Sequence, residues 1–410
     1  MFDFHGAYLN GQLDEDIFME QPPDYETADR ERYVVKLHKT LYGLKQAGKK
    51  WYDLLCHPLA NIGFKKTEGN PAAFYVHMGN DIIILTIHVD DSTMTGSSAI
   101  LQQEYKARIN AKFELTDLGP ISWLLGLAIT RDRATRTLSL SQHAYINTLL
   151  RRFNLEDCKP VAQPLSPHVL FSTDQCPTTI EEKAAMRAVP YREAVGALNW
   201  VTIGTRPDIV FVVGQLARFM ENPGRVHWEA VKRVFRYLKG TQDWKLVYGG
   251  GENQGLEGFA DADGAMQEHR RAISGYVILI DGGAVSWCSK KQELVTLSTT
   301  EAKYVAATHA AKELIWFWRL FGEVFRPLEH PVVLHSDNQS AIALAHSQGQ
   351  FHARTKHIDI RWHFIRYSIE NGSIELIYCP TEDMTADLLT KPLPSAKAKH
   401  FAHALGLLSV

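Results

Sequence analysis

Two adjacent carboxylates mark the first place where this 410-residue sequence could carry out chemistry. Asp90 and Asp91 directly follow the apolar stretch ILTIHV at 84–89. Like charges this close repel, and each loses water on burial, so a buried pair needs a cation; Mg²⁺ prefers such hard oxygen ligands. The pattern therefore predicts a metal site at the end of a hairpin. The alternative is an exposed Asp-Asp turn, for which aspartate is also well suited.

A third carboxylate strengthens the metal interpretation. Asp3 lies in the strand-like stretch FDFHGAYL, and Tyr8 follows five positions later, where its ring could stand over a sugar beside the metal. Three carboxylates that hold two metal ions can support in-line attack of a hydroxyl group on a phosphate. We expect Asp3, Asp90 and Asp91 to form one such site.

Four further carboxylates form a second constellation. Asp261 and Asp337 each stand at the end of a predicted strand. Glu301 lies in the first turn of a predicted helix, and Asp387 lies within the last predicted helix. Together they predict a second metal site.

Each of these four residues also has a structural alternative. Glu301 could complete a capping box with Ser298, and Asp337 could be the N-cap of the helix that follows. Asp387 could face water. Asp263 could be the ligand in place of the aspartate two positions before it.

The segments that must position these carboxylates fall into four regions. Residues 157–190 hold five prolines and little periodicity, as in a linker, and three glycines open the stretch GGGENQG at 249–255. The predicted regions are 1–156, 157–250, 255–395 and a C-terminal tail at 396–410.

Helix and strand signals alternate along the chain. The first region mixes strands such as IIILTIHV with helices such as AILQQEYKARINAKF, whereas the second is mainly helical. Residues 225–240 place Val231, Phe235 and Leu238 on one face and lysines and arginines on the rest, which predicts a surface helix with a solvated basic face. After residue 255, three strands precede alternating helices and strands, which predicts a mixed sheet flanked by helices.

Composition limits the class of protein. The length indicates two or three domains, and 45% hydrophobic and 22% charged residues are ordinary for a globular chain. A net charge of -2 argues against a uniformly basic surface. Five scattered cysteines without a CxxC pair predict neither a zinc site nor a disulfide framework, and the apolar stretches are too short to span a membrane.

Six stretches follow one another in a fixed order, which argues against coincidence. The stretches are FDFHGAYLNGQLDEDIFMEQPPDYE, KLHKTLYGLKQAGKKWYDLL, HVDD, LTDLGPISWLLGLAI, YREAVGALNWVTIGTRPDIVF and HWEAVKRVFRYLKGT. This order resembles the reverse transcriptase and connecting region of copia-type LTR retrotransposon polyproteins, and the resemblance covers nearly the whole chain.

For region 1–156, the resemblance implies a partial right-hand reverse transcriptase, with partial fingers, a palm and a thumb-like end. Asp3 resembles the first catalytic aspartate, and Asp90 and Asp91 resemble the pair of the YVDD-like box. Tyr8 matches the aromatic residue that discriminates against a ribose 2′-hydroxyl. Gln46 matches the glutamine near the incoming nucleotide.

Two departures from the family pattern affect this expectation. His88 replaces the commoner tyrosine of the box, which we interpret as tolerated because both aspartates are intact. The family's fingers region precedes the position of Asp3 and supplies basic residues that hold the triphosphate. Because we expect this chain to lack those residues, we expect polymerase activity to be impaired in the isolated chain.

Five further stretches resemble the copia-type ribonuclease H domain, and they are FADAD, LSTTEAKYVA, HSDNQSAI, RTKHIDIRWHFIR and IYCPTEDMTADLLTKPL. The resemblance implies that Asp261, Glu301, Asp337 and Asp387 hold two Mg²⁺ ions, with Mn²⁺ as a substitute. Many ribonucleases H carry a histidine shortly before the last aspartate, but the stretch CPTEDMTA has none, so we assign no general-acid histidine. We expect His357 to be a structural residue of its helix.

The resemblance as a whole implies an α+β and α/β multidomain enzyme fragment, a reverse transcriptase joined to a ribonuclease H. Its partners would be an RNA template, a DNA primer, deoxynucleoside triphosphates and an RNA/DNA hybrid, two Mg²⁺ ions would serve each active site, and the oligomeric state stays open. We expect it inside the cell, in the cytoplasm, virus-like particles or the nucleus, without membrane association.

Two alternatives remain. One is a catalytically inactive retroelement remnant that at most binds nucleic acid through basic segments with interleaved aromatics, such as KLHKTLYGLKQAGKKW. The other is a cellular ribonuclease H with an unrelated N-terminal domain, which the copia-like stretches before residue 160 disfavour.

Overall fold

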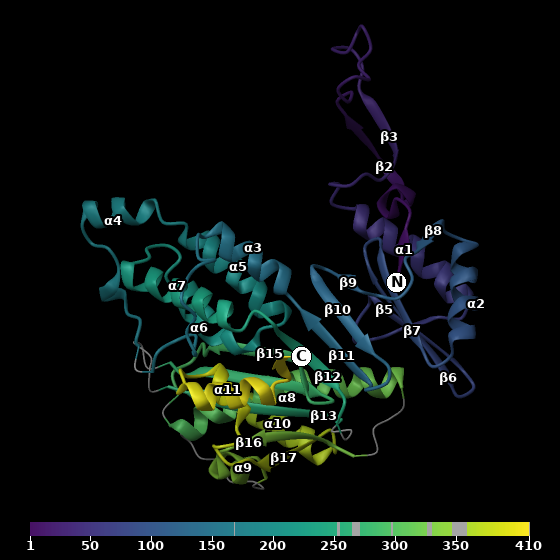
Figure 1. Cartoon of the computed structure of the whole chain (residues 1–410). Helices are drawn as coiled ribbons and strands as arrows, with labels where there is room; N and C mark the ends of the chain where they lie inside the picture. Colours follow the sequence, from purple (N-terminus) through teal and green to yellow (C-terminus); the bar gives the residue numbers. More distant parts are fainter. Residues whose placement is uncertain are drawn as a thin grey trace. The chain divides into compact units, whose positions relative to one another are not determined.

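The computed structural model describes residues 1–167, 169–251, 255–264, 271–296, 298–325, 330–346 and 359–409, so His357 lies outside the described residues. The chain forms two compact units: one holds residues 1–121 with 319–327, and the other holds 122–318 with 328–410. Figure 1 labels their helices and strands. None of the described helices is long and apolar enough to cross a membrane.

The first unit is built on a six-stranded antiparallel sheet with the order β4-β5-β6-β7-β1-β8. Helices α1 and α2 pack against it, and Trp51, Leu55 and Leu59 recur at helical spacing on the buried face of α1. The elements are β1 (Phe2–Phe4), α1 (Ala47–Asn61), β4 (Lys65–Lys66), β5 (Ala73–Met78), β6 (Asp81–His88), β7 (Asp91–Gly96), α2 (Ala99–Asn110) and β8 (Leu115–Asp117).

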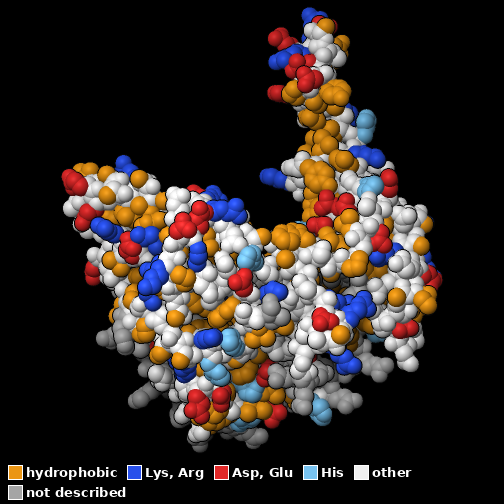
Figure 2. Space-filling model, in the orientation of Figure 1, with side chains coloured by type: hydrophobic (Ala, Val, Ile, Leu, Met, Phe, Trp, Pro, Cys, Tyr) orange, Lys and Arg blue, Asp and Glu red, His pale blue; other side chains and the backbone are white. Residues whose placement is uncertain are grey.

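A two-stranded hairpin extends from the first unit. It consists of β2 (Gln12–Met19) and β3 (Val35–Lys39), and the short helix η1 (Ala7–Asn10) precedes it. Figure 2 shows hydrophobic side chains along this hairpin, and Phe18 is 56% exposed. An isolated pair of strands is marginally stable, so the hairpin depends on its attachment to the unit.

The second unit begins with a sheet of order β18-β12-β11-β10-β9 and a group of helices. Helix α7 spans Arg225–Gly240, and its Val231, Phe235 and Leu238 are fully buried, so the predicted helix and its apolar face are confirmed. Its basic face is not fully solvated as predicted, because its lysines and arginines after residue 230 are half-buried. The other elements are β9 (Trp123–Leu124), β10 (Leu127–Asp132), β11 (Thr137–Ser141), α3 (His143–Arg152), η2 (Thr173–Gln175), α4 (Ile180–Arg187), α5 (Tyr191–Gly204), η3 (Pro207–Ile209), α6 (Val210–Ala217) and β12 (Trp244–Gly249).

The segment predicted as a C-terminal tail is folded over its described residues, 396–409. They form α11 (Ser395–Ala404) and β18 (Leu407–Ser409), and β18 pairs with β12. Phe401, Leu405 and Leu407 are fully buried. Because apolar burial is the main force that holds such segments, this end of the chain is part of the core of the second unit.

The second unit also contains the predicted mixed five-stranded sheet, with the order β15-β14-β13-β16-β17. The first three strands are antiparallel, and β13, β16 and β17 are parallel. The strands of this sheet and the helices of the same part of the chain are β13 (Leu256–Asp263), β14 (Ile273–Ile280), β15 (Gly283–Lys291), α8 (Thr299–Val324), β16 (Val332–Ser336), α9 (Gln339–His346), α10 (Asp359–Glu370), β17 (Ile374–Tyr378) and η5 (Thr385–Leu389). The end of α8, from residue 319, belongs to the first unit.

The last predicted helix differs in type from the prediction. Residues 385–389 form the 3₁₀ helix η5, which is fully buried and closes with a hydrogen bond from the amide of Thr390 to the carbonyl of Asp387. A short buried segment can satisfy its backbone with such i to i+3 bonds, which suit brief helical turns.

Candidate metal centre

The predicted hairpin of the first unit is confirmed. Strands β6 and β7 pair His88 with Asp91, so Val89 and Asp90 form the turn between them. Val89 has a φ of 63°, which is costly for a β-branched residue. The indole Nε1 of Trp51 donates a 2.7 Å hydrogen bond to the Val89 carbonyl, so the core of the unit holds this turn.

The three carboxylates of the first unit lie on neighbouring strands. Asp3 of β1 is the cross-strand partner of Asp91, and the amide of Phe4 donates to the carbonyl of Asp90 at 3.1 Å. Burial, followed by the charges of Asp90 and Asp91, raises the pKa of Asp3. The expected mutual repulsion is therefore present.

Of the two predicted nucleotide-side residues, Tyr8 lies near this turn and Gln46 contacts the hairpin strand β2. The rings of Tyr8 and Tyr42 lie 4.8 Å apart between centroids, and the Tyr42 hydroxyl donates to Oδ2 of Asp90 at 3.3 Å. Gln46 donates through Nε2 to Oε1 of Glu15 at 2.7 Å. Tyr8 is thus linked to the aspartates through Tyr42, while Gln46 is held by the β2 strand.

The mixed sheet of the second unit places two more predicted carboxylates together. Strands β13 and β16 are parallel, with Phe259 beside His335, so their carboxyl ends meet at one edge. Asp261 lies two residues beyond Phe259, and Asp337 directly follows the end of β16.

A glycine allows η5 to bring the third carboxylate to this edge. Gly275 is the cross-strand partner of Asp261. A Cβ at Gly275 would lie 2.6 Å from Cγ2 of Thr390 and 2.9 Å from Cβ of Leu389, both in the segment that follows Asp387. The missing side chain therefore lets this segment lie directly on the sheet.

Within the described part of the chain, one group of carboxylates is compact enough to hold a metal ion. One oxygen each of Asp261, Asp337 and Asp387 lies within 4.8 Å of the others. The side chains of Asp261 and Asp387 are 0% exposed, and that of Asp337 is 6% exposed. Asp3, Asp90 and Asp91 do not form such a compact group.

The structure decides between several alternatives for these residues. Asn338 rather than Asp337 caps α9, because its Oδ1 accepts from the amide of Ala341 at 2.8 Å. Asp387 does not face water. Asp263 stands outside the compact group.

Glu301 also has the capping contact proposed for it. Its amide donates to Oγ of Ser298 at 3.1 Å, in the first turn of α8. Its side chain is buried but is not a member of the compact group.

Lysine side chains contact the buried carboxylates. Nζ of Lys303 lies 3.0 Å from Oδ1 of Asp261 and 2.6 Å from Oδ2 of Asp337. Lys391 lies 2.8 Å from Oδ1 of Asp387 and 3.7 Å from Oδ2 of Asp261.

A third lysine comes from the C-terminal helix. Nζ of Lys397 on α11 lies 3.1 Å from Oδ2 of Asp387 and 3.0 Å from the carbonyl of Thr381. The cluster thus contains three carboxylates and three ammonium groups.

The two fully buried carboxylates have opposite pKa shifts. Burial would raise the pKa of Asp261, but Lys391, Lys303 and the hydroxyl of Thr390 outweigh it and lower the pKa. Burial, followed by the charge of Asp261, raises the pKa of Asp387. One carboxylate is thus held ionised beside another that resists ionisation, as in other pairs of close carboxylates.

The residues of this cluster fit a divalent metal ion. Oδ1 of Asp261 and Oδ1 of Asp387 are buried oxygens without a hydrogen bond, although each has an ammonium group close by. Buried anionic oxygens with unused lone pairs are suitable ligands for Mg²⁺ or Mn²⁺.

Sequence reasoning missed four residues of this site, namely Lys303, Thr390, Lys391 and Lys397. Lys391 follows Asp387 by four positions, a spacing that often brings opposite charges together on a helix, and could have been found on that ground. Thr390 is close to Asp387 in the sequence but reaches Asp261 only through packing, and Lys303 and Lys397 contact the carboxylates only through the packing of separate elements.

Retrotransposon proteins resemble this chain over most of its length. Residues 1–167 match the family model described as reverse transcriptase (RNA-dependent DNA polymerase). The retrovirus-related Pol polyprotein from transposon TNT 1-94 of Nicotiana tabacum is 42% identical over 407 residues, which cover 99% of this chain and 30% of that protein. The putative transposon Ty5-1 protein of Saccharomyces cerevisiae is 31% identical over 323 residues, covering 76% of this chain and 100% of that protein.

The chain belongs to the copia-type retrotransposon polyprotein family. This copia-type chain spans 30% of the length of the tobacco polyprotein. Two solved structures are also similar to it. The foamy viral protease-reverse transcriptase in complex with dsDNA is 14% identical, covers 93% of this chain and 67% of its own, and has a TM-score of 0.47. LC11-RNase H1 in complex with an RNA/DNA hybrid is 15% identical, covers 33% of this chain and 93% of its own, and has a TM-score of 0.26.

Proposed function

We propose that the second unit of this copia-type chain is a Mg²⁺-dependent nuclease that cuts the RNA strand of an RNA/DNA hybrid. The observation that carries the proposal is the compact group of Asp261, Asp337 and Asp387, in which two buried oxygens have no hydrogen bond. Three carboxylates buried this close together repel one another, and a bound divalent ion would relieve that repulsion.

The side chains have separate roles in this proposal. Asp261, Asp337 and Asp387 hold the metal ions, and Glu301 at the start of α8 is the fourth ligand. When bound, two ions would activate a water molecule and stabilise the leaving oxygen of the cleaved RNA phosphate. The Thr390 hydroxyl fixes the orientation of Asp261 through a 2.6 Å hydrogen bond.

We further propose that the first unit carries the carboxylates of a reverse transcriptase. Asp3, Asp90 and Asp91 would hold Mg²⁺, while Tyr8 and Gln46 would lie beside the incoming deoxynucleotide. The cross-strand pairing of Asp3 with Asp91 supports this assignment. Under the same proposal, the first unit binds an RNA template and a DNA primer, and the protein acts inside the cell.

The nuclease proposal is tested with a labelled RNA/DNA hybrid and the purified 410-residue protein. We expect RNA cleavage with Mg²⁺, none with EDTA, and none for Asp261→Asn. Asp263→Asn is the matched control, because Asp263 lies on the same strand outside the compact group, and it should retain cleavage. If a folded protein that binds the hybrid does not cleave it, the chain is an inactive retroelement remnant.

The polymerase proposal is tested separately by primer extension on an RNA template. Extension that Asp90→Asn abolishes would support the assignment of the β6–β7 turn. Extension that continues unchanged in Asp90→Asn would contradict it.

A further inference from the structure

The lysines of the carboxylate cluster are arranged as counter-ions. Lys303 bridges Asp261 and Asp337, and Lys391 contacts Asp387 and Asp261. Two ammonium groups therefore connect all three carboxylates. Both lysine side chains are largely enclosed, with 15% and 27% exposure.

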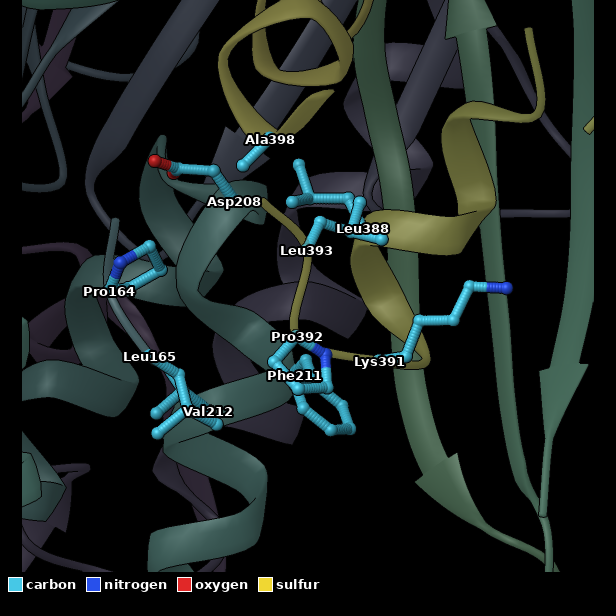
Figure 3. A pocket seen from close by; sticks show the side chains of 10 residues that line it. All are labelled: Pro164, Leu165, Asp208, Phe211, Val212, Leu388, Lys391, Pro392, Leu393 and Ala398. Atoms are coloured by element: carbon cyan, nitrogen blue, oxygen red, sulfur yellow. The ribbon is translucent and has the colours of Figure 1, made fainter. Parts of the chain in front are cut away.

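The position of Lys391 follows from the loop after η5. Pro392 and Leu393 line a small pocket with Phe211 and Val212 of α6 and so hold this loop against the helix. Figure 3 shows that the Lys391 side chain extends away from these apolar residues. Its ammonium group is thereby directed to the carboxylates and not to the pocket.

A cation already beside these oxygens must affect the binding of a second cation. Three close carboxylates repel one another, and an ammonium group 2.8 to 3.0 Å from an oxygen relieves that repulsion. A divalent ion would use the same oxygens, because Oδ1 of Asp261 faces Lys303 and Oδ1 of Asp387 faces Lys391. The lysine and the metal ion cannot both take these positions.

We propose that Lys391 and Lys303 are built-in competitors of the metal ion, which hold the carboxylates together in its absence and set how tightly it binds. The proposal rests on the proposed metal-dependent function of this site. In this proposal the two lysines control the affinity of the site for metal, a role that ordinary structural ion pairs do not have. Removing a competitor and a positive charge should tighten metal binding, whereas removing a structural support should weaken it.

The test is isothermal titration of Mn²⁺ into the full-length protein without nucleic acid. We expect Lys391→Met to lower the Kd by about tenfold, the effect of one nearby unit charge. Lys303→Met should act in the same direction and provides a second variant if the first does not fold. Lys399→Met is the matched control, because Lys399 is an exposed lysine on α11, and its Kd should stay within about twofold of the wild type.

Thermal unfolding provides a second readout. In EDTA, Lys391→Met should melt below the wild type, because the buried carboxylates lose a counter-ion. In saturating Mg²⁺ the variant and the wild type should melt at similar temperatures. A lysine with a merely structural role would leave the deficit unchanged by the metal.

Each outcome is informative about one proposal or both. If the wild type binds Mn²⁺ and cleaves hybrid, but Lys391→Met and Lys303→Met bind it equally or more weakly, the lysine proposal is wrong and the nuclease proposal stands. If neither the wild type nor the variants bind Mn²⁺, the lysine proposal is wrong, and if the wild type also fails to cleave the hybrid, both proposals are wrong.

Discussion

The hydroxyl of Thr390 donates a 2.6 Å hydrogen bond to Oδ2 of Asp261, although 129 positions separate the two residues. Both side chains are buried, with exposures of 1% and 0%. The bond joins the segment after η5 to the first strand of the mixed sheet. It therefore fixes the carboxylate that lies at the centre of the cluster.

Thr390→Val should slow cleavage of the RNA/DNA hybrid by about tenfold to a hundredfold, because a hydrogen bond to a charged group contributes roughly 1.5–3 kcal/mol. Thr390→Ser keeps the hydroxyl and should stay close to the wild type. Cleavage rates at saturating Mg²⁺ measure the effect. Equal rates for the valine variant and the wild type would show that Asp261 needs no such support.

Trp51→Phe should destabilise the first unit by about 1–3 kcal/mol, because it leaves the partly buried carbonyl of Val89 without its donor. Denaturant unfolding measures the change. Tyr52→Phe is the control, since it removes a more exposed hydrogen bond from the same helix, to the carbonyl of Pro71, and should cost less. An equal loss for both variants would contradict a special role for Trp51 at the turn.

Asp208→Asn should destabilise the second unit by about 3–5 kcal/mol, because it leaves the guanidinium of Arg206 buried without its counter-ion. The two side chains are 1% and 0% exposed, and their shortest contact is 2.7 Å. The hydroxyl of Tyr237 also donates to Asp208 at 2.7 Å.

The matched control for this ion pair is Glu229→Gln. The pair of Glu229 with Lys232 is partly exposed, and breaking it should cost less than about 1 kcal/mol. Denaturant unfolding compares the two variants. A small loss for Asp208→Asn would mean that water or another anion reaches Arg206.

The stability of the second unit should fall as the pH falls from about 6.5 to about 4. Burial lowers the pKa of His227 from 6.5 to about 4. The unfolded chain therefore takes up a proton in this window while the folded chain does not, which favours unfolding by about 3 kcal/mol in total. Above pH 6.5 His227 is neutral in both the folded and the unfolded chain, so its contribution to the free energy of unfolding is constant.

Denaturant unfolding at several pH values tests this dependence. His227 accepts a 2.8 Å hydrogen bond from the amide of Gly224 and stacks on Phe219. His227→Gln keeps an acceptor but cannot take up a proton, so its stability should depend less on pH than that of the wild type. The same slope for both proteins would contradict the assignment to His227.

Local patterns predicted the elements of both sites. The apolar run that ends at the two aspartates of HVDD predicted the β6–β7 hairpin, and the order of strands after residue 255 predicted the mixed sheet. The strand-end positions of Asp261 and Asp337 also followed from these patterns. These features depend on neighbours in the chain, which periodicity and turn residues describe directly.

Other features were misjudged because they depend on distant partners. The residues after 395 have no strong pattern, yet β18 pairs with β12, and the carbonyl of Gly406 accepts from the amide of Val247 at 2.8 Å. A strand of three residues is stable only when it pairs with another strand and packs against an apolar core. No local signal could predict that partner.

The sequence by itself determined which carboxylates are available and on which kinds of element they stand. Only the tertiary structure decided that Asp261, Asp337 and Asp387 converge, that Asp263 stands outside the group, and that Lys303 and Lys391 neutralise it. The physical reason is that charge interactions depend on distances of a few ångströms and on burial. Both arise from the packing of β13, β16, α8 and η5, which lie far apart in the sequence.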